Sequence, residues 1–346
     1  MKLFTFPYYN KFSCKASRCT DSCCKGWEVR IDPSTEAKYR TLCGALGDKI
    51  RSVMCDGEEG AVFEMSGGRC PFLNDSGLCD IITEYGEDMI SDICKRHPRY
   101  FTALSDVVYG GLGMSCEEAA RLILTEDGRE YVESNAHIND GEEYDPELYD
   151  AVISARNKCI DIIYQSADIY SALSGVLSEI SRIDSVIYGC ETAENTTRDR
   201  GYTEFKDCIE EFVDFLSGLE YMSGELLERL RSLLECPDLS ARSLDASERV
   251  YLTRIMSYLV DRYLTPVILD GDCTGASAVI AVSVAVVSLL FLSERENDLD
   301  GAVHLAKLYS SEIEYSTDNL DIIRDADEKV IDLVCQIAKD IVKRSL

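Results

Sequence analysis

Residues 273–293 read CTGASAVIAVSVAVVSLLFLS, 21 residues without a single charged side chain. That length is close to what a helix needs to cross a bilayer. Many of the side chains are small, however, and Ser277, Ser283 and Ser288 interrupt the apolar run. We therefore expect a helix buried inside an all-α domain, with its serine hydroxyls bonded to carbonyls one turn earlier, rather than a membrane span.

The sequence on both sides of this run has helical periodicity. Apolar side chains recur at the spacing of one helix face from residue 146 to residue 183. Further helices are expected at residues 203–218, 223–235, 246–264, 298–316 and 325–344. The sequence shows neither alternating strands and helices nor a glycine-rich nucleotide-binding motif. These patterns predict a mainly α fold, with a helical domain over residues 146–346.

The first 130 residues are cysteine-rich and punctuated by glycine. Ten of the sixteen cysteines lie in residues 1–116. Residues 1–10 contain no apolar secretory segment, so we expect a cytoplasmic protein. Clustered cysteines in such a chain indicate metal ligands or redox groups rather than disulfides. We expect residues 1–130 to form an irregular, cysteine-rich metal-binding domain packed on the helical domain.

Eight of these cysteines are candidate metal ligands. Residues 14–24 read CKASRCTDSCC, residues 69–81 read RCPFLNDSGLCDI, and two more cysteines follow in ICKRHPR and at the start of a helical pattern, EEAARLIL. Thiolates suit iron–sulfur clusters or zinc. Because adjacent side chains diverge, one member of the Cys23–Cys24 pair can bind metal while the other faces a second site or packs. The candidates are Cys14, Cys19, Cys23, Cys24, Cys70, Cys79, Cys94 and Cys116.

The remaining cysteines are expected to be free or packed thiols. Cys43 and Cys55 lie between the clusters in a region with fewer turn signals. Six others occur singly on helical patterns, where a thiol behaves as a small apolar group in the core. These are Cys159, Cys190, Cys208, Cys236, Cys273 and Cys335.

The charge of the chain is strongly uneven. Residues 1–100 hold 14 basic and 15 acidic side chains, so nearly all of the net charge of −28 lies in the rest of the chain. An acidic body disfavours nucleic acid, whose binding depends on contacts to phosphates. It favours a basic partner, such as a lysine-bearing protein surface.

The cysteine segments resemble the flagellin lysine-N-methylase (FliB-type) family, which is related to a CxxCxxCC zinc- or iron-chelating domain family. The matching segments run from about residue 7 to residue 124 and end in GLGMSCEEAARLIL. Two positions depart from the family pattern. Glu117 stands where the family often has Pro, and His97 stands where it often has Tyr.

The resemblance implies transfer of a methyl group from S-adenosylmethionine to lysine amines of flagellin. It also implies an iron–sulfur cluster, expected to be a 4Fe–4S cluster, with zinc as the alternative. A lysine ammonium must lose a proton before it attacks the methyl group, and Glu118 is the candidate base. Trp27, Arg99 and Arg121 are the candidate residues for binding the methyl donor, although each could instead shield the metal or balance its charge.

Two other functions stay open on sequence grounds. The chain could be a non-enzymatic zinc- or iron-chelating module whose helical half binds a partner, or an iron–sulfur redox protein. The sequence predicts no oligomeric state.

Overall fold

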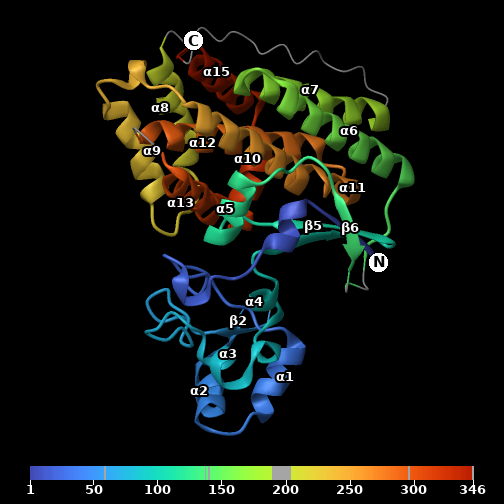
Figure 1. Ribbon diagram of the computed structural model, residues 1–346, viewed down its shortest axis with the longest axis vertical. Helices are drawn as coiled ribbons and strands as arrows, with labels where there is room; N and C mark the ends of the chain where they lie inside the picture. The colour runs from blue at the N-terminus through green and yellow to red at the C-terminus, as the bar shows by residue number, and fades with distance from the viewer. Residues whose placement is uncertain (58–59, 137, 139–140, 189–203, 295–296, 345–346) are drawn as a thin grey trace. The chain divides into compact units, whose positions relative to one another are not determined.

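The computed structural model describes residues 1–346 except 58–59, 137, 139–140, 189–203, 295–296 and 345–346, so the prediction for Cys190 lies outside the described residues. The fold is mainly helical, as predicted. The chain forms two compact units (Figure 1). The cysteine-rich unit comprises Ser13–Tyr100 with Cys116–Glu118, and the helical unit comprises Met1–Phe12, Phe101–Ser115 and Ala119–Leu346.

Helix α12 (Cys273–Ser293) is the centre of the helical unit. Its most hydrophobic 18-residue window is 94% buried, which confirms the predicted buried helix. Among the described residues it alone is long and apolar enough to cross a membrane, a test that core helices of soluble proteins also pass. Ser283 Oγ donates to Val279 O at 2.5 Å, and Ser288 Oγ donates to Val284 O at 2.6 Å.

Among the described residues, six helices pack against α12. Leucine, valine and isoleucine side chains on their inner faces bury its surface. The six are α7 (Ile169–Tyr188), α9 (Glu225–Glu235), α10 (Ala246–Leu264), α13 (Leu299–Tyr309), α14 (Thr317–Arg324) and α15 (Glu328–Arg344). The five helices expected after residue 200 in addition to α12 are all present, as α9, α10, α13, α15 and α8 (Phe205–Leu216). The pattern over residues 146–183 is divided into α6 (Pro146–Gln165) and α7.

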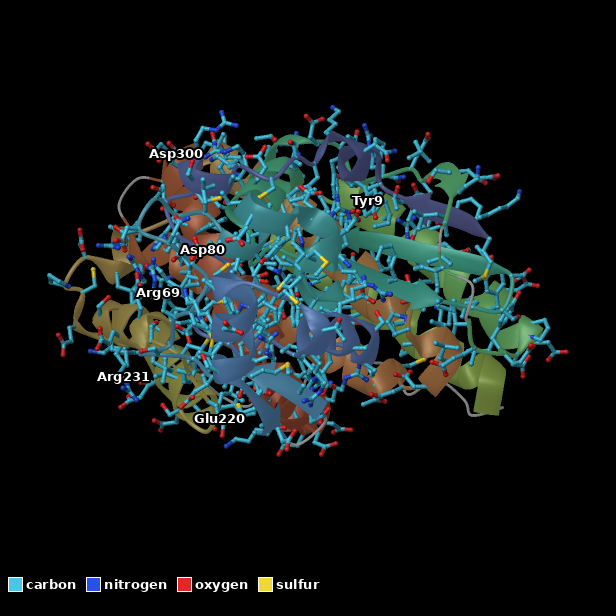
Figure 2. The ribbon with its side chains drawn as sticks, turned by 90° about the horizontal axis from the view of Figure 1, so that it is seen from below. Tyr9, Arg69, Asp80, Glu220, Arg231 and Asp300 are labelled. Carbon is cyan, nitrogen blue, oxygen red and sulfur yellow. The ribbon has the colours of Figure 1, made fainter. Side chains whose placement is uncertain are left out.

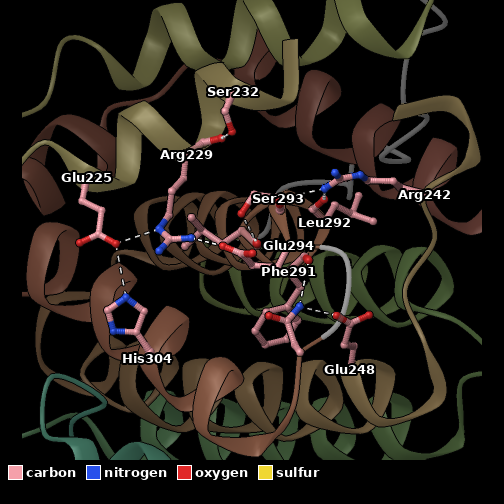
Figure 3. Close-up of polar contacts among 12 residues, drawn as sticks. Glu225, Arg229, Ser232, Arg242, Glu248, Phe291, Leu292, Ser293, Glu294 and His304 are labelled. Carbon is pink, nitrogen blue, oxygen red and sulfur yellow. Dashed lines mark hydrogen bonds and ion pairs between the residues drawn. The ribbon is translucent and has the colours of Figure 1, made fainter. Parts of the chain in front are cut away.

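Polar side chains cap both ends of α12. Helix ends leave backbone groups without intrahelical partners. At the N-terminus, Asp272 accepts a hydrogen bond from Gly275 N at 2.8 Å. At the C-terminus, Arg242 Nη1 donates to the carbonyls of Leu292 and Ser293 at 2.7 and 2.8 Å (Figure 3). The positive charge of this arginine also suits the negative end of the helix dipole.

The later cysteines divide by burial. Cys159, Cys208, Cys273 and Cys335 are buried as predicted. Cys236 differs from the prediction because it is half-buried, with its Sγ donating to Asp238 Oδ1 at 2.8 Å.

A four-stranded sheet was not predicted from the sequence. Its order is β4-β5-β1-β6, with β1 parallel to β5 and antiparallel to β6. The strands are β1 (Lys2–Thr5), β4 (Arg99–Ala103), β5 (Val107–Leu112) and β6 (Val132–Asn135). Next to it, the buried Arg156 on α6 lies 3.8 Å from the ring centroid of Tyr131 and donates to Asp261 on α10 at 3.1 Å.

The cysteine-rich unit is built from short elements around a small core. Its helices are α1 (Pro33–Thr41), α2 (Ala45–Val53), α3 (Asp80–Tyr85) and α4 (Asp92–Arg96), and its hairpin joins β2 (Met54–Gly57) to β3 (Gly60–Phe63). The largest buried side chains are Tyr39, Phe63 and Phe72. Helix α5 (Glu117–Thr125) begins directly after Cys116.

The enclosure of α12 predicts a large effect of truncation at its centre. Ile280 is fully buried, so Ile280→Ala should lower the free energy of unfolding by about 2–5 kcal/mol. Ile322 on α14 is 42% exposed, and the same substitution there should change it by less than about 0.5 kcal/mol. Chemical denaturation followed by circular dichroism measures both. Equal effects would contradict the central position of α12.

Candidate metal centre

Four cysteines from separate segments pack on one hydrophobic core. Cys70 is buried in it, and Cys24, Cys79 and Cys94 pack against it. Backbone pairing holds three of the segments together. Cys70 N donates to Cys24 O at 2.9 Å, and Asp80 N donates to Phe72 O at 2.8 Å. These two bonds hold the segments that carry Cys70 and Cys79 next to the segment that carries Cys24.

Donors point at the sulfurs of these cysteines. Cys70 accepts from the backbone N–H of Phe72, and Cys79 accepts from those of Ile81 and Ile82. Ser91 Oγ donates to Cys94 Sγ at 3.3 Å. Hydrogen bonds to sulfur favour the thiolate and tune the clusters that thiolates bind. These donors therefore stabilise the thiolate form of the three sulfurs.

Burial favours the protonated thiol at the same cysteines and so raises their pKa. It raises the pKa of Cys70 to about 12 and the pKa of Cys94 to about 11, because a thiolate is poorly solvated in an apolar core. A metal that takes these sulfurs as ligands must displace their protons, so binding of metal and loss of protons are linked.

The adjacent thiols of Cys23 and Cys24 are hydrogen-bonded to each other. The bond from Cys23 lowers the pKa of Cys24 to about 6, with help from Ser22 and from the charge of Arg69, although burial opposes the shift. The same bond between the two thiols raises the pKa of Cys23. Arg69, labelled in Figure 2, is fixed by donating to the carbonyls of Leu73 and Asn74, both at 2.9 Å.

Glu117 joins the remaining cysteine segments, a role that was not predicted from its place in the sequence. Its carboxylate accepts from Thr20 N at 2.8 Å, from Thr20 Oγ1 at 2.7 Å and from Lys15 Nζ at 2.5 Å. Burial acts to raise the pKa of Glu117, but these hydrogen bonds outweigh it and bring the pKa to about 2. The carboxylate is therefore ionised at neutral pH.

Each partner in this contact lies next to a candidate ligand. Lys15 follows Cys14, Thr20 follows Cys19, and Glu117 follows Cys116. The signal in the sequence was an acidic residue in the first turn of a helix, directly after a cysteine. Such residues are common for dipole reasons alone, so only the fold reveals the contact.

The candidate ligands are all cysteines, the residue type that iron–sulfur clusters use. Across the described ranges, no three His, Cys, Asp or Glu side chains are arranged around one point as ligands of a single metal ion. A zinc ion requires four ligands that converge on it. Thiolates around a cluster are further apart, because iron and sulfide atoms lie between them, and cysteine is the usual ligand of such clusters. Cys43 and Cys55 are exposed and free.

Comparison with known proteins supports the resemblance. A stretch of 126 residues, 34% of this chain, is 28% identical to the flagellar biosynthetic protein FliU of Salmonella muenchen and covers 75% of it. Lysine-N-methylases of Salmonella typhimurium and Salmonella choleraesuis are 28% and 29% identical over 126 and 129 residues. The chain is a relative of the FliB-type lysine-N-methylases. The matched stretch is 31% of the length of either methylase.

Other comparisons add nothing to this family relationship. No family model matches the chain, and no solved structure matches it.

Three of the residues predicted for methylase chemistry belong to the cysteine-rich unit. Glu118 lies 3.9 Å from Lys15 Nζ. Trp27 Nε1 donates to Cys23 O at 2.6 Å, and its ring stacks on His97 with centroids 6.3 Å apart. Arg99 is half-buried at the start of β4. The fourth, Arg121, belongs to the helical unit, where it binds Asp300 at 2.6 Å.

The Glu117 contact predicts local protection of the backbone. In Glu117→Gln the ionised acceptor is replaced by a neutral one, so hydrogen exchange at the Thr20 amide should speed up roughly 10-fold. Glu118→Gln is the matched control, because its carboxylate lies 3.9 Å from Lys15 Nζ, a longer contact than that of Glu117. Exchange measured by mass spectrometry or NMR checks both. Unchanged exchange at Thr20 in Glu117→Gln would show that the carboxylate does not hold this segment.

The same contact predicts a pH dependence. The pKa of Glu117 is lowered from 4.5 to about 2, so its contribution to stability is fully present above pH 4.5 and is lost as the pH falls towards 2. The difference in Thr20 exchange between the parent protein and Glu117→Gln should therefore shrink over that range. A difference that persists at the acidic end would contradict the assignment.

Proposed function

We propose that this chain is a protein-lysine N-methyltransferase that moves a methyl group from S-adenosylmethionine to lysines of flagellin in the cytoplasm. The observation that carries the proposal is the similarity to two proteins named lysine-N-methylase and to a flagellar biosynthetic protein. The net charge of −28 supports it, because an acidic surface attracts a lysine-bearing substrate.

The chemistry needs a group that takes a proton from the lysine ammonium. In this proposal Glu118 accepts that proton on its carboxylate, directly or through a water molecule. The freed lone pair on lysine Nζ then forms the new N–C bond while the C–S bond of the donor breaks and its electron pair stays on sulfur. Glu118 is half-buried, and its carboxylate lies 3.9 Å from the ammonium group of Lys15. A substrate lysine would have to approach the carboxylate in the same way.

Trp27 and Arg99 are proposed to bind the methyl donor. The indole of Trp27 is held by its hydrogen bond to Cys23 O, which fixes the ring next to the cysteines. An aromatic face attracts a cation such as a sulfonium, and a guanidinium suits a carboxylate. Arg121 is less suited to this role, because Asp300 already pairs with it.

The proposal includes an iron–sulfur cluster on the cysteines. When bound, it would cross-link their loops and place a fixed charge among them. Direct displacement of a methyl group by an amine exchanges no electrons. The part of the thiolates in this proposal is therefore to hold in place the segments that carry Trp27 and Glu118.

Methylation of flagellin tests the proposal directly. Full-length protein purified without oxygen is incubated with flagellin and S-adenosylmethionine, and modified lysines are identified by peptide mass spectrometry. The parent protein should add methyl groups to lysine, and Glu118→Gln should slow turnover by about 100-fold or more at unchanged iron content. Glu87→Gln, an exposed acid in the same unit, is the control and should keep full activity.

Two results would overturn the proposal or part of it. Protein with full iron content that neither binds the donor nor modifies flagellin is not a methyltransferase of this kind. A reversible change in its visible absorption on reduction would then favour a redox protein. If the parent protein is active and Glu118→Gln is equally active, the base is another residue.

A further inference from the structure

Three of the seven large apolar side chains that are exposed in the described part of the chain belong to one region of the helical unit. Met222 is 50% exposed, Ile322 is 42% exposed and Tyr315 is 36% exposed. They lie in the loop between α8 and α9, on α14, and at the end of a π-helical turn, Ser310–Glu314. We propose that these side chains and the carboxylates beside them form a docking surface for a lysine-bearing segment of the protein substrate.

Buried polar side chains hold the three segments together. Asn319 on α14 accepts from Glu220 N at 2.8 Å through its Oδ1, and its Nδ2 donates to Glu220 O at 2.7 Å and to Glu312 O at 3.0 Å. The buried carboxylate of Glu312 accepts from Met222 N at 2.7 Å and from Ser223 N at 3.1 Å. The loop, the π-helical turn and α14 therefore form one connected surface.

The π-helical turn is also anchored in the core of the helical unit. Glu314 is buried, and its carboxylate accepts from the hydroxyl groups of Tyr258 at 2.9 Å and Tyr263 at 2.7 Å, both on α10. π-Helical turns are rare and occur frequently at functional sites. Because the fold already orders this surface, a partner that docks on it loses little free energy in ordering it.

The charge of the surface decides which partner it suits. Glu220, labelled in Figure 2, and Asp318 and Asp321 on α14 are exposed. The basic side chain of α14, Arg324, donates to Asp272 at 2.8 Å and so does not neutralise them. Apolar side chains beside unneutralised carboxylates complement a segment that carries both lysine and apolar residues. A second copy of the same face would bring like charges together, so it is disfavoured as the occupant.

This inference rests on the proposed function, because it takes flagellin as the partner. It adds the surface on which flagellin is held. Trp27 and Glu118, the residues proposed for the methyl donor and the proton, are not part of this surface. Changes to the surface should therefore alter the affinity for flagellin and its KM, and should leave kcat and the affinity for S-adenosylmethionine unchanged.

Reversal of charge on α14 tests the electrostatic part. In the full-length chain, Asp318→Lys combined with Asp321→Lys should weaken the binding of monomeric flagellin and raise its KM, both by about 10-fold. Asp150→Lys combined with Asp161→Lys makes the same change in net charge at two exposed positions of α6 and should change either value by less than about 2-fold. Binding is measured by fluorescence anisotropy of labelled flagellin. Added salt should weaken binding to the parent protein more than binding to the α14 variant.

Truncation of the apolar side chains tests the other part. Met222→Ala combined with Ile322→Ala should weaken the binding of flagellin by about 5-fold. Val250→Ala is the matched control, because Val250 is 46% exposed on α10, and it should bind as the parent protein does.

The outcomes separate this inference from the proposed function. Methylation with unchanged affinity and KM in both surface variants would overturn the docking surface and leave the function standing. Binding that falls in the surface variants without any methylation would refute the methyltransferase and leave the docking surface standing. A parent protein that binds no flagellin would overturn both. A parent protein that sediments as a dimer, with surface variants that sediment as monomers, would assign the surface to a second copy and overturn the inference.

Discussion

An α-helix that is apolar on every side must be enclosed, and α12 imposes this constraint on the helical unit. Six helices in the described part of the chain cover it, and Asp272 and Arg242 cap its two ends. Exposing such a helix to water would cost about 25 cal/mol for each Å² of apolar surface, so the surrounding helices have little freedom to rearrange. The buried pair of Arg156 and Asp261 then fixes α6 to α10. The excess of acidic side chains after residue 100 is compatible with this arrangement, because the buried core consists mainly of apolar side chains.

The cysteine-rich unit is stabilised in a different way. Its core is small, and two carboxylates connect segments that are distant in sequence. Asp32 accepts from Thr35 N and Asp92 N, both at 3.0 Å, and these bonds outweigh burial to hold its pKa well below the ordinary range. Glu117 does the same for the segment around Thr20. Units with small cores commonly need disulfides or metals in addition, and thiolates placed among these links would meet that need.

Much of the fold could be predicted from the sequence, because its main signals are local. Periodicity within single segments indicated the helices, and composition alone indicated the burial of α12. The sheet was missed because β1 and β6 have four residues each and pair across more than a hundred residues of sequence, so neither segment carries a pattern of its own. Cys236 was assigned to the core because a thiol at helical spacing carries no sign of its polar neighbour Asp238.

The candidate site was predictable only as a set of residue types. Density and spacing identified eight cysteines, but their grouping depends on contacts with Cys70 and Glu117, both remote from the first cluster. Glu117 and Glu118 are equivalent by pattern, and only the fold shows that Glu117 makes the close contacts. The family resemblance implied a reaction, and residue chemistry in this chain indicates which side chains to test for it.

In the function proposed for this chain, metal bound to these thiols is part of the fold of the cysteine-rich unit. Amide hydrogen exchange of the full-length chain, compared between iron-reconstituted and metal-stripped protein under reducing conditions without oxygen, tests it most directly. Residues 14–24 and 70–96 should lose protection when the metal is removed, while α10 and α12 should keep theirs. Unchanged protection in the cysteine-rich unit would contradict the claim.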